Sequence, residues 1–142
     1  GRVGTSLHTF EVPSPEDFRL STPILTAELE EVDGAPRPRV VLNRTFRAGQ
    51  ILYCQVQVHG AADDPKERLP HVRSGYELRK GDTLVRAVEP TRIRAEWDGR
   101  LSRLMGLSLE GAATGNYTLV LSAEDELTGE TFTVSEPFTV LP

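Results

Sequence analysis

The 142-residue chain has one cysteine, only two lysines and no long apolar run. A lone Cys54 cannot form an internal disulfide, and it cannot build a cysteine-rich zinc site. The longest apolar runs are of the size of residues 51–54, whereas a membrane helix needs roughly 20 apolar residues. We therefore expect no membrane insertion and no disulfide framework.

Basic charge is also scarce. Sixteen Lys and Arg residues stand against 21 Asp and Glu residues, which gives a formal net charge of −5. The basic residues do not form a cluster, so the release of counterions that drives nucleic-acid binding has little to act on. Nucleic acid is not an expected partner.

The residues that are abundant indicate an all-β fold. Thirteen Val, 13 Thr and 3 Ile are β-branched, and the 12 Gly and 10 Pro recur between them. β-Branched residues favour strands, whereas prolines spaced along most of the chain would break a helix. The sequence therefore predicts short strands joined by turns.

The clearest strand is expected at residues 51–59, where Leu52, Cys54, Val56 and Val58 alternate with polar residues. This alternation is typical of a strand with one buried face. The same period predicts strands at 117–123 and 131–140, and weaker patterns predict them at 20–30, 39–46, 72–79, 83–89, 92–97 and 104–110. Seven to nine short strands without helices between them favour an antiparallel sandwich of two sheets.

Residues 109–119 show the pattern of a tyrosine corner. A strand ends, a glycine-containing turn follows, and Tyr117 enters the next strand. In such corners the tyrosine hydroxyl bonds to backbone a few residues upstream and fixes the crossing between sheets. We expect an architectural role for Tyr117.

Several segments together resemble a known kind of domain. They are residues 18–26, the turn 46–50, the strand entry 115–119, the hairpin 124–129 and the closing strand 136–140. Over residues 18–140 the chain resembles the carboxy-terminal immunoglobulin-like β-sandwich of bacterial exported proteins with von Willebrand A-related or GWxTD-type regions. The GWxTD motif itself does not occur. The resemblance implies an immunoglobulin-like sandwich, export to the periplasm or cell surface, and an accessory role with no catalytic residues.

The domain organisation follows from these patterns. Residues 1–17 are expected to be a linker or a loosely attached first strand, and residues 18–142 a single sandwich domain. No secretion signal is recognisable at the amino end, so such a signal is expected to have been removed or to lie outside these residues.

Catalytic equipment is not apparent in the sequence. His8, His59 and His71 lack the spacing of a metal motif, and no Gly-x-Ser-x-Gly elbow occurs. Cys54 lies in the apolar set of its strand, which predicts a buried and inert thiol. A hydrolase would need a cleft that gathers Cys54 or paired carboxylates with His59 or His71. We expect no enzyme activity, no catalytic residue, no cofactor and no metal site.

A calcium site is a weaker alternative. Loops of a sandwich can supply the oxygens that calcium needs, although no Asp-x-Asp-x-Asp-Gly ladder is present. The positions to test would be Asp63, Asp64, Glu124 and Asp125.

The single tryptophan separates two functional hypotheses. Ile93, Ala95 and Trp97 share one face of their segment, which favours burial of Trp97. The leading hypothesis is therefore a non-catalytic spacer or interaction module whose partner is another protein or another domain of the same chain. The alternative is a carbohydrate- or other ligand-binding module that uses Trp97 with Tyr53 or Tyr76.

Overall fold

The computed structural model of the chain describes residues 17–39, 44–95 and 100–142. These residues form eleven strands and no helix. Accordingly, no helix among them is long and apolar enough to cross a membrane. The all-β composition predicted from the β-branched residues and prolines is confirmed.

One sheet has four strands arranged around β6 (Ile51–His59). β1 (Arg19–Leu20) and β2 (Ile24–Thr26) pair with β6 along one edge, and β9 (Leu101–Ser108) pairs along the other, all antiparallel. The pairing with β6 is interrupted between β1 and β2 at Pro23, which has no backbone N–H to donate to β6. Ser21 bridges the interruption, because its N–H donates to Gln57 O at 2.8 Å.

The second sheet has five strands in the order β5-β11-β10-β7-β8. These are β5 (Thr45–Arg47), β7 (Val72–Lys80), β8 (Thr83–Arg92), β10 (Gly115–Asp125) and β11 (Thr131–Leu141). The pairs are antiparallel except that of β5 with β11, which is parallel.

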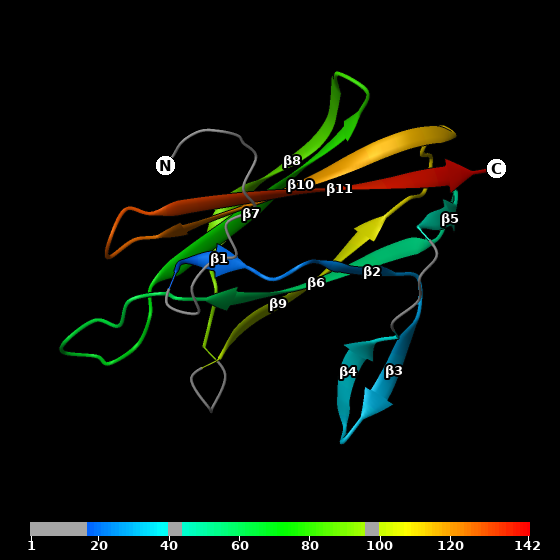
Figure 1. Cartoon of the computed structure of the whole chain (residues 1–142). Helices are drawn as coiled ribbons and strands as arrows, with labels where there is room; N and C mark the ends of the chain where they lie inside the picture. The colour runs from blue at the N-terminus through cyan, green and yellow to red at the C-terminus, as the bar shows by residue number, and fades with distance from the viewer. Residues whose placement is uncertain (1–16, 40–43, 96–99) are drawn as a thin grey trace, which may run out of the picture.

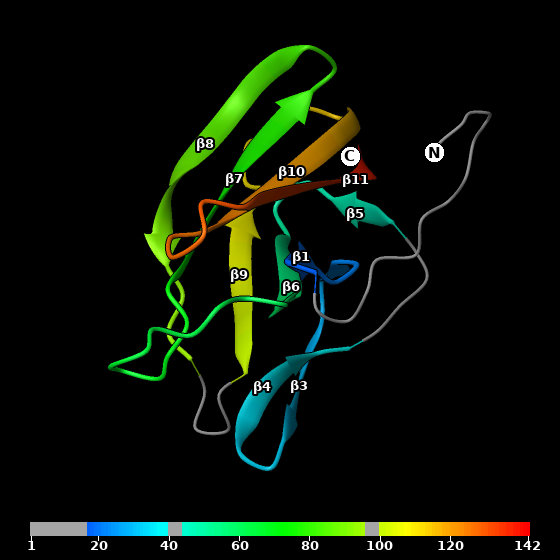
Figure 2. The same ribbon diagram turned by 60° about the vertical axis from the view of Figure 1, so that its left-hand side comes forward.

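Together the two sheets form an immunoglobulin-like sandwich (Figure 1). The amino-terminal strands pair with β6 in one sheet, and the chain then crosses to pair β5 with the last strand in the other. The sandwich contains nine strands, which agrees with the predicted seven to nine. β3 (Leu29–Val32) and β4 (Ala35–Pro38) form a separate ribbon that projects from one end (Figure 2).

Alternate side chains of the long strands fill the space between the sheets. β6 contributes Leu52, Cys54, Val56 and Val58, as its sequence pattern predicts. β10 contributes every second residue from Tyr117 to Ala123 in the same way. Burying such side chains contributes roughly 1.5–3 kcal/mol each, so these two strands carry much of the stability of the fold.

Tyr117 makes the hydrogen bond that its sequence context predicts. Its hydroxyl donates to Ala113 O at 2.6 Å. The ring stacks on Phe138 with the centroids 5.5 Å apart, and Phe138 meets Phe46 edge-on at 5.7 Å. The turn before β10 is thereby tied to the parallel β5–β11 pair.

Arg103 links the two sheets along the β9 side of the sandwich. Its guanidinium donates to Ser74 O at 2.7 Å and to the carbonyls of Thr91 and Arg92 at 3.2 Å each. Partial burial lowers the pKa of Arg103 below its ordinary value. One side chain of β9 therefore holds the backbones of β7 and β8 in place.

Three of the weaker strand predictions are wrong in detail. The segment predicted as one strand at 20–30 contains three strands, because Pro23 interrupts it and because residues 29–32 turn away to pair with β4. The predicted strand 92–97 does not form at its described positions, since β8 ends at Arg92 and Ile93 turns to donate to Val72 O. The predicted strand 39–46 lies partly outside the described residues, and the described part begins β5 only at Thr45.

The Tyr117 hydroxyl provides a test of the corner. We expect Tyr117→Phe to lower the free energy of unfolding by about 1 kcal/mol, because one buried hydrogen bond is lost while the ring stacking remains. Urea unfolding followed by circular dichroism would measure it. Tyr53→Phe, on the outer face of β6, is the matched control and should change stability by less than about 0.5 kcal/mol. Equal losses for the two variants would contradict the architectural role.

Candidate functional site

Cys54 is positioned as a core residue and not as a nucleophile. Its side chain is fully buried on the inner face of β6. Burial raises the pKa of the thiol to about 12, and the charge of Glu136 adds to this effect while Arg44 opposes it. Since the reactive species is the thiolate, Cys54 is neutral and inert at physiological pH.

The structure separates the other groups that a hydrolase would need. His59 follows the polar alternation of β6 and therefore faces away from Cys54. His71 lies at the end of the β6–β7 loop, and His8 lies outside the described residues. Among the described residues, the histidines therefore do not join Cys54 in one cleft.

The three aromatic candidates also lie apart. Trp97 falls in residues 96–99, outside the described part of the chain. Tyr53 lies on the outer face of β6, opposite Gly106 of β9, with its ring edge 3.4 Å from where a Cβ at position 106 would lie. Tyr76 lies on β7 of the other sheet and packs against the core. Tyr53 and Tyr76 therefore belong to different surfaces.

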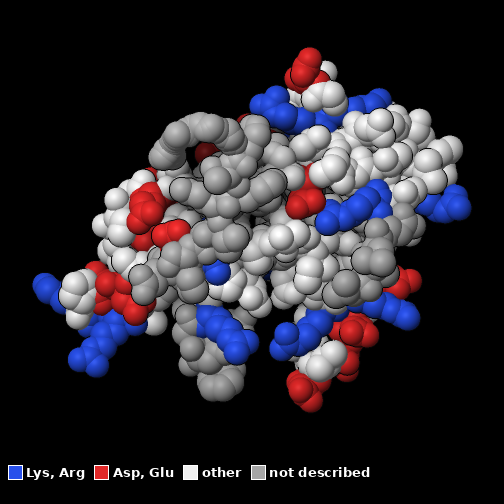
Figure 3. Space-filling model, in the orientation of Figure 1, with Lys and Arg blue, Asp and Glu red and all other residues white. Residues whose placement is uncertain are grey.

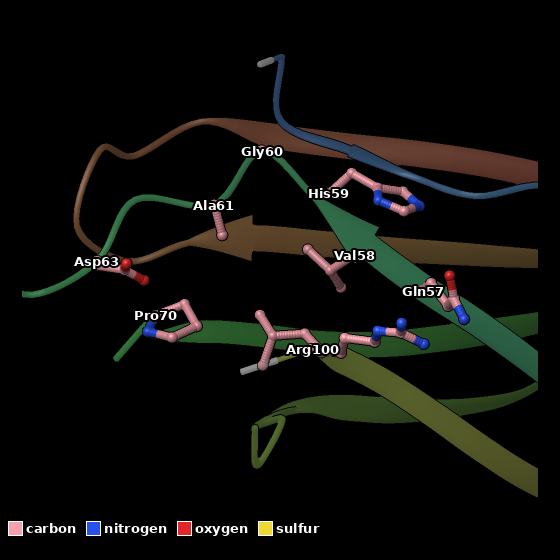
Figure 4. A pocket seen from close by; sticks show the side chains of 9 residues that line it. Gln57, Val58, His59, Gly60, Ala61, Asp63, Pro70 and Arg100 are labelled. Carbon is pink, nitrogen blue, oxygen red and sulfur yellow. The ribbon is translucent and has the colours of Figure 1, made fainter. Parts of the chain in front are cut away.

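A hollow lies at one end of the sandwich, where β6 ends and β9 begins (Figure 4). It has a volume of about 520 Å³, and Gln57, His59, Asp63 and Arg100 are the polar residues of its lining. Gly60 is required at its rim, because a Cβ there would collide with the backbone carbonyl of Asp17. Pro70 belongs both to this hollow and to a second one of about 320 Å³ beside Glu67 and His71.

The β6–β7 loop between these hollows, residues 60–71, is closed by its own backbone. Asp64 N–H donates to Leu69 O at 2.8 Å, and Arg68 N–H donates to Asp64 O at 2.7 Å. The Asp64 carboxylate accepts the N–H groups of Lys66 and Glu67 at 2.8 and 2.9 Å. These two bonds, aided by the charge of His71, lower the pKa of Asp64 below its ordinary value.

A buried carboxylate joins this loop to the β10–β11 hairpin. Asp125 is fully buried, and its oxygens accept the N–H of Ala62 at 2.9 Å and of Leu127 at 3.0 Å. The N–H of Glu126 donates to His71 O at 2.8 Å. Asp125 therefore positions two loops, which gives this member of the sequence-predicted calcium set a structural role.

The remaining calcium candidates do not converge with Asp125. Glu124 pairs with Arg73 at 2.9 Å, and Asp63 forms a β-bridge with Pro70. Within the described ranges, one group of potential metal ligands comes together instead: Asp64, Glu67 and His71, with ligand atoms within 4.8 Å of one another. Only Asp64 belonged to the predicted set. Both acidic and basic side chains are gathered over this end of the molecule (Figure 3).

One edge of the five-stranded sheet is formed by the exposed strand β8. All ten residues of β8 are exposed, and Leu84, Val85 and Val88 are 48%, 50% and 41% exposed. A hollow of about 410 Å³ runs from β8 across β7 and β10 to Thr133 of β11. Gly75 leaves room there for the β8 backbone, since a Cβ at position 75 would lie 2.6 Å from Val88 O.

These features define the chain as an immunoglobulin-like β-sandwich with an ordered β6–β7 loop and an exposed edge strand, β8. It is similar to the crystal structure of a Niemann-Pick type C2 protein from the Japanese carpenter ant, with 11% identity, a TM-score of 0.49, and coverage of 94% of this chain and 100% of that one. It is also similar to the CARDB domain of the PF1109 protein from Pyrococcus furiosus, solved in complex with di-metal ions, with 11% identity, a TM-score of 0.42, and coverage of 93% and 100%. Comparison with family models and with curated proteins gives no match.

The Asp125 carboxylate should be essential to the packing of the β6–β7 loop against the β10–β11 hairpin. We expect Asp125→Asn to lower the free energy of unfolding by about 2–3 kcal/mol, because an amide replaces one of two buried acceptor oxygens by a donor facing an N–H. Chemical denaturation would measure the loss, and amide exchange should show faster exchange at Ala62 and Leu127. Glu124→Gln, next in sequence and half exposed, should cost less than about 0.5 kcal/mol. An Asp125→Asn chain as stable as the wild type would rule out this role.

The thiol of Cys54 should resist modification in the folded protein. At pH 8 we expect alkylation by iodoacetamide to be at least about a thousandfold slower than for a free cysteine, because the raised pKa leaves almost no thiolate. Mass spectrometry over time would follow the reaction, with the urea-unfolded chain as the control that reacts fully. Rapid labelling of the folded chain would contradict the inert assignment.

Proposed function

We propose that the chain is a non-catalytic interaction module of an exported multidomain bacterial protein, and that it docks a protein partner or another domain of the same chain. The chemistry of the described residues supports this proposal. Cys54 is neutral and buried, and the carboxylate of Asp125 is used to hold backbone. The thiol of Cys54 and the buried carboxylate of Asp125 thus have structural roles.

The observation that carries the proposal is the exposure of β8. Three large aliphatic side chains in one strand, Leu84, Val85 and Val88, are each at least 41% exposed. Scattered exposed apolar residues are ordinary on protein surfaces, but several in one strand beside a hollow are typical of a docking surface. Val88 lines the 410 Å³ hollow, and Leu84 and Val85 precede it in the same edge strand. We call Leu84, Val85 and Val88 together with this hollow the β8 surface.

The β8 surface binds through side chains and not by addition of a strand. The pairing of β8 with β7 shifts register between Ser74 and Tyr76 and again between Leu78 and Arg79. Such bulges twist an edge away from further pairing, and Pro90 removes a donor from it. A partner is therefore expected to insert apolar side chains against β8.

The chemistry of the hollow indicates what such a partner presents. Ala87, Val88 and Val120 give it apolar walls, while Glu77 and Glu89 place carboxylates on its border. Glu77 is paired with Arg79 at 3.1 Å. The hollow therefore fits an apolar anchor side chain flanked by a basic group.

Carbohydrate binding is the second candidate, favoured by one observation. The ring of Tyr53 lies beside Gly106 on the outer face of the four-stranded sheet, so the residue opposite it on β9 has no side chain. A half-buried tyrosine ring on an outer sheet face can stack on a sugar. This site would be separate from the β8 surface.

The docking proposal is tested by titrating the chain with the remaining domains of its parent protein in a calorimeter. We expect micromolar binding for the wild type, about −8 kcal/mol. Val85→Glu and Val88→Glu should weaken it at least tenfold, because each places a charge in the apolar contact.

Ile51→Glu is the matched control, because Ile51 is 45% exposed but lies on the other sheet. It should leave the affinity unchanged. Absence of any association, or a loss with Ile51→Glu that equals the loss with Val88→Glu, would refute docking at β8.

A further inference from the structure

We infer that Asp64, Glu67 and His71 form a binding site for a divalent transition metal such as Zn²⁺. The three residues belong to one short loop, and one ligand atom from each lies within 4.8 Å of the others. One imidazole nitrogen and two carboxylate oxygens make a donor set that suits zinc. This inference is independent of the proposed docking at β8.

The spacing of the donor atoms already approaches that of a metal site. His71 Nε2 and Glu67 Oε1 are 3.3 Å apart. Around a tetrahedral zinc ion with bonds of about 2.0–2.2 Å, neighbouring ligand atoms lie about 3.4 Å apart. One edge of the coordination shell is thus formed, and the ligand atoms of the other two pairs already lie within 4.8 Å of one another.

The loop holds the first ligand in place before any metal arrives. Two backbone N–H groups bond Oδ1 of Asp64, so the carboxylate is oriented with its other oxygen available. The loop is closed by the Asp63–Pro70 bridge and by two further backbone bonds at Asp64. Ligands on a preorganised backbone lose less conformational entropy when they bind.

The other two ligands, His71 and Glu67, are accessible to a metal ion from solvent. The side chain of His71 is 15% exposed and that of Glu67 is 58% exposed. Both line the 320 Å³ hollow, which has room for the water molecules that would complete a coordination shell. The nearby Arg92 is paired with Glu126 at 3.0 Å, so its charge is largely compensated.

The donor set also selects among metals. Calcium and magnesium prefer six or more oxygen ligands, which this trio does not offer. Lys66 and Arg68 flank Glu67 in sequence, and their positive charges oppose a cation. We therefore expect binding of moderate strength, with a dissociation constant in the micromolar range, about −8 kcal/mol.

The test is a calorimetric titration of the metal-stripped, tag-free chain with ZnCl₂ at pH 7.5. We expect one ion per chain, and at least tenfold weaker binding after His71→Gln or Glu67→Gln. Chemical shifts of the His71 ring in NMR spectra should change with the first equivalent. Calcium at millimolar concentration should not compete.

Control variants test whether zinc binds at the other histidines instead. His59→Gln and His8→Gln remove the remaining histidines and should leave the zinc affinity unchanged. Glu67→Gln alters an exposed side chain, so circular dichroism should show an intact fold even if His71→Gln is less stable. The inference is overturned if the wild type binds no zinc below about 1 mM, if either control weakens binding as much as His71→Gln, or if calcium binds there regardless of His71.

Discussion

The alternation of buried and exposed side chains along β6 and β10 is the constraint on which the remaining structure depends. A shift of one residue in either strand would turn its apolar set toward solvent. The register of β9 on β6, and of β7 and β11 on β10, is therefore fixed by burial. Once these strands are placed, Arg103 and Asp125 can reach backbone partners that lie far away in the sequence.

The parts of the fold that the sequence predicts well are those governed by this alternation. Residues 51–59 form β6 with the predicted bounds, and the Tyr117 hydroxyl reaches Ala113 as expected. The strands of the amino-terminal region are harder to predict from sequence, because they are two to four residues long and too short to show an alternation of apolar and polar residues. The path of this region depends on which neighbouring strands have unpaired backbone N–H and C=O groups, and the local sequence pattern does not contain that information.

The candidate sites show the same division. Burial of Cys54 follows from its strand, but the meeting of Asp64, Glu67 and His71 depends on a loop that turns back at Arg68 with a positive φ of 58°. Their spacing matches no familiar metal motif. The local signal in the sequence is the Asp64-Pro65 pair, which favours the start of a turn. Likewise, the sequence of β8 looks like an ordinary strand, and its exposure follows from its place at the end of the sheet order.

The β3–β4 ribbon stands outside both sheets. Its strands pair only with each other, and the backbone bond from Arg39 N–H to Glu28 O at 2.9 Å closes its base. The turn at its tip, with Asp33 and Gly34 both at positive φ, touches neither layer of the sandwich. Foreign sequence spliced into that tip, from an epitope tag to a whole fluorescent protein, would therefore be carried as a side branch while the two layers assemble undisturbed.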